Sequence, residues 1–379
     1  MRIVRLANFV MPRSGGLRTA LQALGEGYRA AGHDPVLVIP GERAGEQDTP
    51  YGKVITVRGV AVPGTGGYRV ILGQRRLADL LDRLAPDCLE VSDRFTLRWT
   101  ARWARERGIG SVMVSHESLA GLLGVAGAGR IGRWFTDRLN RRSADQYDVV
   151  VCTTNWAGAE FRRLDVTNLV EVALGVDLDL FHPHRRDPLL RARLARPDQA
   201  LIVHCGRLSP EKRPGRSVEA LRTVLADGVH AVLVVAGDGP LGGRLRRRAA
   251  GLPVQFVDFV ADRTSLAALL ATADVVLAPG PIETFGLAAL EALACGTPVV
   301  VDARSALPEV IGDAGAAVVG EGPAFGAGVL EVLRRGEASR RAAARARAEK
   351  FGWSEAVGGF LAAHALAAAR PLDADRNGA

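Results

Sequence analysis

Residues 275–303 read VVLAPGPIETFGLAALEALACGTPVVVDA, and this stretch decides the fold class. VVLAP at 275–279 and PVVVDA at 298–303 are short valine-rich runs, which are typical of buried strands. The apolar segment between them has the length of a short helix, which we expect to open at Gly286. A strand, a helix and a second strand in this order join two parallel strands.

The same alternation of short β-branched runs and longer helical stretches continues along the chain. In the first half we expect strands at 2–9, 36–40, 54–59, 88–93, 111–116, 149–154 and 169–174. In the second half we expect them at 201–206, 231–237, 254–259, 275–279 and 298–303. Because such apolar strands are buried on both faces, helices should cover both sides of each sheet.

The alternation lapses at 175–200, where prolines and dense charge predict a linker. With 379 residues, the chain is also too long for a single core. We therefore expect an α/β protein of two doubly wound, Rossmann-like domains, 1–175 and 176–353, followed by a helix and tail at 354–379 that can cross back to the first domain. Ligands of such sheets bind beyond the carboxyl ends of the strands, which predicts a binding cleft between the domains.

The net charge of +8 does not indicate a nucleic-acid partner. Residues 1–175 hold 24 basic and 18 acidic side chains, so most of the excess lies in the first half. The chain has no dense Lys/Arg block and only 5% aromatic residues, which argues against nucleic-acid binding. Of 49 basic residues only Lys53, Lys212 and Lys350 are lysines.

The cysteines and the apolar runs predict a cytoplasmic protein without a metal centre. Cys88, Cys152, Cys205 and Cys295 show no CxxC or zinc-like spacing, which indicates buried, reduced thiols. The opening MRIVRLANFV begins as a strand rather than a signal peptide, and no apolar run reaches the 18 residues of a spanning helix. Peripheral contact with the inner face of the plasma membrane remains compatible with this pattern.

Glycines follow two of the predicted strands. Gly15 and Gly16 precede a helix that begins near Leu17, where backbone amides can bind an anion, although a tight turn explains the pair equally well. Residues 237–242, GDGPLG, form a GxGxxG pattern with Asp258 about twenty residues on, as in nicotinamide-binding proteins. Pro240 stiffens that turn, so a glycine turn beside a nucleotide pocket is the favoured interpretation.

Two basic residues and two acidic residues carry the main chemical signal. Arg207 and Lys212 lie on the loop after strand 201–206, where both can converge on a phosphate. Glu283 and Glu291 are eight residues apart around a helix start, which places them on nearly the same face. They can hold the hydroxyls of two sugars, while the amides of the helix start bind a diphosphate. The alternative for Glu291 is a role in supporting its helix.

Three further segments have both a functional and a structural interpretation. His116 and Asp93 end predicted strands, where they can face a bound sugar or simply support the fold. Residues 119–142 mix apolar side chains with arginines at helical spacing, which suits an anionic membrane surface or an ordinary surface helix. Asp177-Leu178-Asp179 has the form of a metal-binding DxD but lies in the predicted linker, so we interpret it as structural.

The order of these motifs resembles retaining GT-B glycosyltransferases of family 4. Within this family, the motifs most specifically resemble the members that use GDP-mannose to add an α-1,6-mannose to a phosphatidylinositol dimannoside. The stretches that carry it are ANFVMPRSGGLRTAL (7–21), EVSDRFTLR (90–98), SHESL (115–119), VVCTT (150–154), GVDLDLFHPHRR (175–186), VHCGRLSPEK (203–212) and APGPIETFGLAALEALACGTP (278–298).

The resemblance implies a role for each matching residue. It implies a nucleotide-sugar donor, an anionic glycolipid acceptor and no metal. Phosphate contacts would come from Gly15 and Gly16 at the first helix together with Arg207 and Lys212. Contacts to the transferred sugar, the ribose and the base would come from His116, Glu283, Phe285, Gly286, Leu287, Glu291, Asp258, Phe259 and Val260. The residues show no carboxylate nucleophile pair, so we expect front-face transfer with retention, in which the leaving diphosphate is stabilised electrostatically.

Four other functions remain open at this point. The acceptor can be another membrane glycolipid, such as a glucuronosyl diacylglycerol, or a small soluble molecule. The two-domain architecture also suits a non-hydrolysing nucleotide-sugar epimerase, which needs no acceptor. The pattern at 237–242 is also compatible with a nicotinamide-dependent oxidoreductase. The motifs taken together are compatible with a non-catalytic protein that binds a nucleotide sugar.

Overall fold

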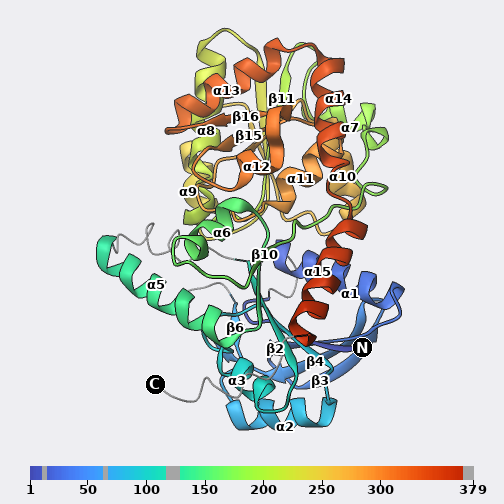
Figure 1. Cartoon of the computed structure of the whole chain (residues 1–379). Helices are drawn as coiled ribbons and strands as arrows, with labels where there is room; N and C mark the ends of the chain where they lie inside the picture. The colour runs from blue at the N-terminus through green and yellow to red at the C-terminus, as the bar shows by residue number, and fades with distance from the viewer. Residues whose placement is uncertain (11–14, 63–66, 117–128, 370–379) are drawn as a thin grey trace. The chain divides into compact units, whose positions relative to one another are not determined.

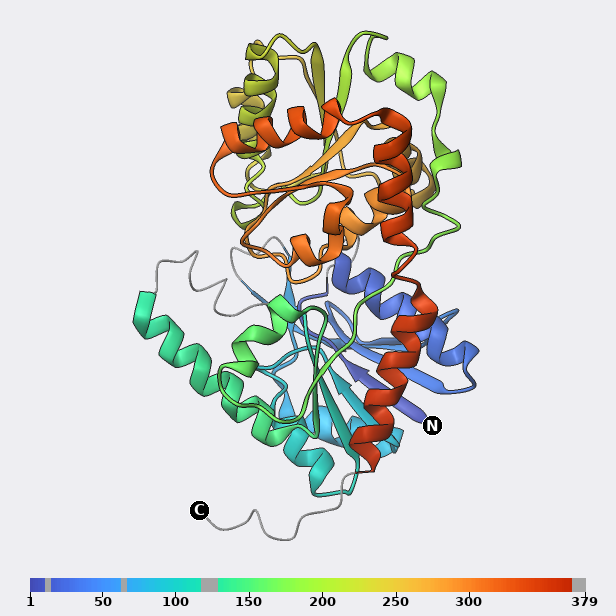
Figure 2. The same ribbon diagram turned by 45° about the horizontal axis from the view of Figure 1, so that its top comes forward.

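The computed structural model describes residues 1–10, 15–62, 67–116 and 129–369. The chain divides into two compact units. Unit 1 comprises Met1–Ala173 and the C-terminal stretch from Trp353 onward, and unit 2 comprises Leu174–Gly352. Each unit has a largely parallel sheet covered by helices on both faces, as the two views in Figure 1 and Figure 2 show. The predicted α/β class with two Rossmann-like sheets is confirmed.

Unit 1 is built on an eight-stranded sheet with the order β10-β9-β8-β7-β1-β2-β4-β3. Only the edge strand β3 runs antiparallel to its neighbour. The strands of this sheet are β1 (Arg2–Leu6), β2 (Asp34–Gly41), β3 (Gly45–Thr49), β4 (Gly52–Arg58), β7 (Cys88–Val91), β8 (Gly110–Ser115), β9 (Val149–Cys152) and β10 (Leu169–Glu171). A separate antiparallel pair is formed by β5 (Val60–Ala61) and β6 (Arg69–Val70).

The helices of unit 1 include the last helix of the chain. They are α1 (Gly16–Ala30), α2 (Gln74–Leu84), α3 (Trp99–Arg105), α5 (Gly129–Gln146), α6 (Asn155–Arg162) and α15 (Trp353–Ala368). Both views show α15 beside α1, and it also packs on β8 (Figure 1, Figure 2). Gly27 of α1 permits this packing, because an added Cβ would come within 2.1 Å of Val357 on α15.

Unit 2 has six strands, all parallel, in the order β13-β12-β11-β14-β15-β16. This is the order of a doubly wound sheet. The strands are β11 (Ala200–Cys205), β12 (Ala231–Ala236), β13 (Val254–Val257), β14 (Val275–Ala278), β15 (Val299–Asp302) and β16 (Ala316–Val318). The helices are α7 (Pro188–Leu194), α8 (Gly215–Ala226), α9 (Gly242–Arg248), α10 (Arg263–Thr272), α11 (Leu287–Ala294), α12 (Leu307–Ile311), α13 (Gly322–Arg334) and α14 (Glu337–Ala348), with 3-10 turns η1 (Pro183–Arg185), η2 (Pro210–Lys212) and η3 (Gly312–Ala314).

The stretch 175–200 is not the linker that the sequence predicts. It contains η1 and α7, and both belong to unit 2. The start of α7 has a clear local cause, because the Asp187 carboxylate accepts the N–H groups of Leu189 and Leu190 while Pro188 occupies the first turn. Charge and proline in this stretch therefore mark a capped helix.

Of the helices in the described part of the chain, none combines the length and apolarity needed to cross a bilayer.

Candidate donor-binding site

The carboxyl edge of the unit 2 sheet gathers most of the residues singled out in the sequence. Because the six strands are parallel, the loops after them meet at one edge of the sheet. The loop after β11 carries Arg207 and Lys212, and the loop after β12 carries the glycine turn at 237–242. The loops after β13 and β14 carry Asp258, Phe259, Val260, Glu283, Phe285 and Gly286, and the candidates Leu287 and Glu291 lie on α11.

Lys212 and Glu283 form an ion pair that links two of these loops, between Nζ and Oε1. The side chains remain 35% and 21% exposed, so both are accessible to a ligand. The loops touch at their backbones as well, because a Cβ on Gly280 would lie 3.2 Å from the Glu211 carbonyl oxygen. The structure thus brings together a cation and a carboxylate that are 71 residues apart in the sequence.

A buried arginine that sequence reasoning missed holds the start of the Glu283 loop. Nη1 of Arg216 donates to the Pro279 carbonyl at 3.2 Å and to the Asp302 carboxylate at 2.7 Å. Further along, the Ala306 N–H donates to the Glu283 carbonyl at 2.9 Å. Nothing in the sequence distinguishes Arg216 from the many other arginines, since its role depends on contacts with distant residues.

Helix α11 begins directly after this loop, at a glycine that the geometry requires. Gly286 has φ +83°, and a Cβ there would come within 2.2 Å of the Leu307 side chain. Phe285 is buried against Phe351, with ring centroids 6.1 Å apart. These contacts fix the position of the helix start, where backbone N–H groups of the first turn can bind an anion.

Glu291 is buried on α11 and pairs with Arg263 of α10, at 3.3 Å between Oε1 and Nη2. Burial raises the pKa of Glu291 to about 7, even though Arg263 works in the opposite direction. Hydroxyl groups that donate hydrogen bonds to a buried carboxylate with this pKa would stabilise its ionised form. A ribose has such hydroxyl groups. Arg263 was not predicted, because only the fold shows that it faces Glu291.

The glycines at 237–242 have a structural explanation that needs no dinucleotide. A Cβ on Gly237 would lie 2.0 Å from the Gly206 carbonyl oxygen, and one on Gly239 would lie 2.6 Å from the Leu208 carbonyl oxygen. The Leu208 N–H also donates to the Asp238 carbonyl at 2.9 Å. The glycine turn therefore packs against the loop that carries Arg207, and this close approach explains Gly237 and Gly239.

Asp258, Phe259 and Val260 lie at the edge of the sheet, after its outermost strand β13. The Asp258 side chain is 94% exposed and lies 3.6 Å from Arg246. Phe259 is 42% exposed. These residues are accessible at the same sheet edge as Lys212 and Glu283.

In unit 1, Gly15 and Gly16 lie at the start of α1. Gly15 caps this helix with φ +119°, and the first turn of the helix carries no acidic side chain. Both glycines are exposed, and a Cβ added to Gly15 would have no other atom of the described residues within 4 Å. An exposed helix start of this kind suits an anion.

His116 follows β8 at the carboxyl edge of the unit 1 sheet and is half-buried. Desolvation lowers its pKa to about 4; Glu90 acts in the opposite direction, and Arg5 and Arg94 lower the pKa further. The imidazole is therefore neutral at physiological pH. Arg94, missed in the sequence, is buried, pairs with Glu160 at 2.7 Å and hydrogen-bonds to Ser115, the residue before His116.

Asp93 and Asp177 have local structural roles. The Asp93 carboxylate accepts bonds from Asn8 Nδ2 at 2.9 Å and from the Phe95 N–H at 2.7 Å, which organises the loop after β7. The Asp177 carboxylate accepts the N–H groups of Asp179 and Leu180, as in an Asx turn. The structural interpretation of the DxD sequence is consistent with this geometry.

Comparison with known proteins agrees with the fold. The glycosyl transferase 4-like domain family matches residues 15–176, and the family of glycosyl transferases group 1 matches residues 186–349. The chain belongs to the GT-B glycosyltransferases.

One relative is similar along almost the whole chain. The GDP-mannose-dependent alpha-(1-6)-phosphatidylinositol dimannoside mannosyltransferase of Mycobacterium tuberculosis is 50% identical over 364 residues, which cover 96% of this chain and 95% of the relative. The D-inositol 3-phosphate glycosyltransferase of Geodermatophilus obscurus is 36% identical over 61% of this chain and 53% of its own length.

Solved structures share the fold at much lower identity. The sucrose-phosphate synthase of Thermosynechococcus elongatus superposes with a TM-score of 0.77 at 21% identity, covering 97% of this chain and all of the other. A glycosyltransferase of Rickettsia africae gives 0.73 at 15% identity, with 98% and 99% covered.

Proposed function

We propose that this chain transfers mannose from GDP-mannose to a phosphatidylinositol dimannoside, forming an α-1,6 linkage and the trimannoside. The observation that carries the proposal is the 50% identity to the mycobacterial mannosyltransferase over nearly the full length of both chains. The Lys212–Glu283 pair and the start of α11 supply the kind of groups that a nucleotide-sugar donor needs.

Donor binding rearranges the ion pair. The diphosphate draws Lys212 away from Glu283, with Arg207 and the start of α11 as its other contacts. The freed carboxylate of Glu283 then accepts hydrogen bonds from hydroxyl groups of the mannose. The two cations supply the charge that the leaving diphosphate requires, so we infer that transfer proceeds without a metal ion.

The nucleoside is held by the buried carboxylate and the sheet edge. Glu291 accepts hydrogen bonds from two ribose hydroxyl groups, while Arg263 balances the negative charge of Glu291. Asp258, Phe259 and Val260 form the surface for the base, where the exposed Phe259 ring can stack on it.

The chemical step is a front-face substitution with retention. The acceptor hydroxyl oxygen forms a bond to C1 of mannose as the bond from C1 to the diphosphate oxygen breaks. The hydroxyl proton passes to the departing diphosphate oxygen. Neutral His116, at the carboxyl edge of the unit 1 sheet, can form a hydrogen bond with a sugar hydroxyl as donor or acceptor.

The glycolipid acceptor requires a protein that reaches a membrane surface, and α5 has features that suit this role. Trp134 and Phe135 are 65% and 51% exposed on α5, and Arg138 lies over the Trp134 ring at 6.0 Å. Exposed aromatic rings beside arginines bind an anionic bilayer surface. Residues 119–128 of the predicted membrane-facing stretch lie outside the described residues.

A thermal-shift panel tests the donor directly. We expect GDP-mannose to raise the unfolding temperature of the full chain more than UDP-glucose, UDP-N-acetylglucosamine or NADH at equal concentration. Because we infer that no metal ion is needed, a chelator should leave the increase in unfolding temperature with GDP-mannose unchanged. A larger shift with another nucleotide sugar would refute the proposed donor, and a shift with NADH alone would favour an oxidoreductase.

Vesicle co-sedimentation tests the membrane contact. We expect the chain to bind vesicles that contain phosphatidylinositol, and the double variant Trp134→Ser, Phe135→Ser to bind several-fold more weakly. Phe95→Ser, which removes an exposed ring from another segment, is the control. Equal binding of all three proteins would reject α5 as the contact.

A further inference from the structure

Asp302, at the carboxyl end of β15, is a fully buried carboxylate outside the proposed donor contacts. Its Oδ2 accepts hydrogen bonds from Arg216 at 2.7 Å and from the Arg304 side chain at 2.6 Å. Its Oδ1 accepts the backbone N–H and the Nε–H of Arg304, each at 2.9 Å. Both oxygens are therefore engaged by donors inside the fold, and two arginines balance the charge of the carboxylate.

Arg216 connects Asp302 to the start of the loop that carries Glu283. The same Nη1 that donates to Asp302 also donates to the carbonyl of Pro279, the residue directly after β14. Arg216 is buried, so water does not compete for these bonds. One guanidinium nitrogen thus joins the end of β15 to the point where the Glu283 loop leaves β14.

The turn that follows Asp302 holds a later part of the same loop. Ser305 Oγ donates to the Asp302 carbonyl at 2.7 Å and accepts the Leu307 N–H at 3.2 Å. The N–H of Ala306, in the middle of this turn, donates to the Glu283 carbonyl at 2.9 Å. The backbone of Glu283 is therefore fixed by a turn that is itself bonded to Asp302.

Leu307 extends this contact to the start of α11. A Cβ on Gly286 would come within 2.2 Å of the Leu307 side chain, so the two segments lie in close contact. The loop between β14 and α11 is thus held at its start by Arg216 and at its end by the turn after β15. Both contacts lead back to Asp302.

We propose that Asp302 is a positioning residue for the transferred sugar and acts through the loop between β14 and α11. This role rests on the proposed function, in which Glu283 binds the mannose and the start of α11 binds the diphosphate. A small displacement of a bound sugar from its reacting position slows the chemical step strongly even when the nucleotide still binds. Asp302 itself touches neither the sugar nor the diphosphate.

Asp302→Asn in the full chain should lower kcat for mannose transfer by about 10- to 100-fold, with kcat expressed per chain that binds GDP. Because both oxygens of Asp302 accept N–H groups, the amide of an asparagine places N–H donors against an arginine donor in either orientation. The KM for GDP-mannose should change less than kcat, because Glu291 and residues 258–260 still bind the nucleoside.

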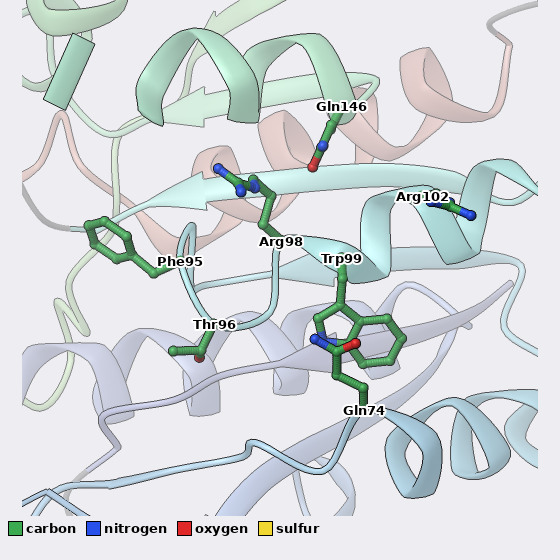
Figure 3. Close-up of a pocket in the computed structure, with 7 residues that line it drawn as sticks. All are labelled: Gln74, Phe95, Thr96, Arg98, Trp99, Arg102 and Gln146. Carbon is green, nitrogen blue, oxygen red and sulfur yellow. The ribbon is translucent and has the colours of Figure 1, made fainter. Parts of the chain in front are cut away.

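Glu321→Gln is the matched control. Glu321 accepts bonds from the same guanidinium of Arg216, at 2.9 Å from Nε and 2.6 Å from Nη2, but it is 67% exposed and precedes α13. This variant should keep kcat within about two-fold of the parent. A second control is Arg102→Gln, since Arg102 lies on α3 at a cavity of unit 1 (Figure 3) and forms an exposed pair with Glu106 at 2.8 Å.

Hydrogen exchange tests the same role without the transfer reaction. In Asp302→Asn the amides of 279–290 and 303–308 should exchange faster than in the parent, while both controls should exchange as the parent does. Ser305→Ala removes only the hydroxyl that links the Asp302 carbonyl to the Leu307 N–H. It should show the same pattern with smaller changes, and it replaces Asp302→Asn if that variant does not fold.

The outcomes distinguish this proposal from the proposed function. A parent chain that transfers no mannose from GDP-mannose would refute the proposed function, and the exchange at 279–290 would still decide whether Asp302 holds the loop. With an active parent, equal kcat for Asp302→Asn and Glu321→Gln, a change in KM alone, or unchanged exchange at 279–290 would overturn the role of Asp302. If Asp302→Asn does not fold, parent-like kcat and exchange in Ser305→Ala would overturn it.

Discussion

The ion pair of Lys212 with Glu283 is the contact on which the proposed donor chemistry rests. It holds a cation and a carboxylate in an accessible position, each ready to exchange its partner for a phosphate or a hydroxyl. The same geometry makes both residues sensitive to substitution for different reasons. In the proposed donor complex, Lys212 stabilises the developing charge, whereas Glu283 binds the sugar.

Removing the cation should slow transfer strongly. Lys212→Ala should lower kcat/KM by about 100- to 1,000-fold, the usual effect of losing one group that stabilises a leaving anion. Lys53→Ala is the matched control, since Lys53 forms only an exposed pair with Glu46 at 3.5 Å. Initial rates with radiolabelled donor measure the effect, and equal rates for both variants would show that Lys212 does not act on the diphosphate.

The raised pKa of Glu291 predicts a pH dependence of donor affinity. In the proposed donor complex, ribose hydroxyls donate hydrogen bonds to the ionised carboxylate. The ionised fraction of a group with a pKa of about 7 falls about ten-fold between pH 8 and pH 6. The Kd for GDP-mannose should therefore rise by up to about ten-fold as the pH falls over this range. Glu291→Gln should bind more weakly at pH 8 and lose this dependence, and a parallel slope in both proteins would refute the assignment.

At the level of single residues, sequence reasoning identified side chains that follow strands but not their partners. The signal for Lys212, Glu283 and Glu291 is their position after a strand or at a helix start, and this position follows from local pattern. Arg216 and Arg263 gain their roles from packing between elements distant in the sequence. Local pattern cannot distinguish such arginines from those on the surface.

At the scale of elements, the start of α11 depends on a glycine. Gly286→Ala should destabilise the chain by about 1–3 kcal/mol, because alanine is strained at φ +83° and its Cβ would collide with Leu307. Gly358→Ala on α15 meets open space and should be neutral or slightly stabilising. Chemical denaturation measures both, and equal stability of the two variants would contradict the strain.

Long apolar elements could be predicted from the sequence, while short and polar ones could not. The central strands β11 and β12 lie where their apolar runs predict them, because burial on both faces requires a largely continuous apolar sequence. β3 reads GEQDT and is exposed except at its last residue, so its pairing with β4 produces no hydrophobic pattern in the sequence. The helix at 188–194 was missed for the opposite reason, since its charge resembled that of a linker.

At the scale of the whole molecule, a buried polar cluster ties the end of the chain to unit 1. Glu90 on β7 pairs with Arg5 at 2.8 Å and accepts a hydrogen bond from Tyr28 at 2.8 Å. His364 on α15 lies 3.1 Å from Glu90 and 3.0 Å from the Cys88 sulfur. The last helix thus completes the core of the unit that contains the first residues.

This cluster predicts a dependence of stability on Glu90. Glu90→Gln should reduce the free energy of unfolding by about 3 kcal/mol or more, because it leaves the buried Arg5 charge without a counter-ion. Glu46→Gln, at an exposed pair, should cause no measurable change. Urea denaturation compares the two variants, and a loss of stability no larger than that of Glu46→Gln would show that the cluster is unimportant.

The same carboxylate gives the stability a defined pH dependence. Burial alone would raise the pKa of Glu90, but Arg5 and His364 outweigh it and hold the pKa well below its usual range. Its stabilising contribution is therefore complete above the pKa of the unfolded chain and declines as the pH falls below about 4.5.

The central claim is the transfer of mannose to a phosphatidylinositol mannoside, and one assay tests it most directly. Radiolabelled GDP-mannose is incubated with phosphatidylinositol dimannoside and the purified chain, and the lipid product is analysed for its linkage and anomer. The account predicts label in a trimannoside with an α-1,6-mannose, formed at least about 100-fold more slowly with Lys212→Ala. Label in a soluble product only, a β-mannosyl linkage, or conversion of the nucleotide sugar without any acceptor would contradict it.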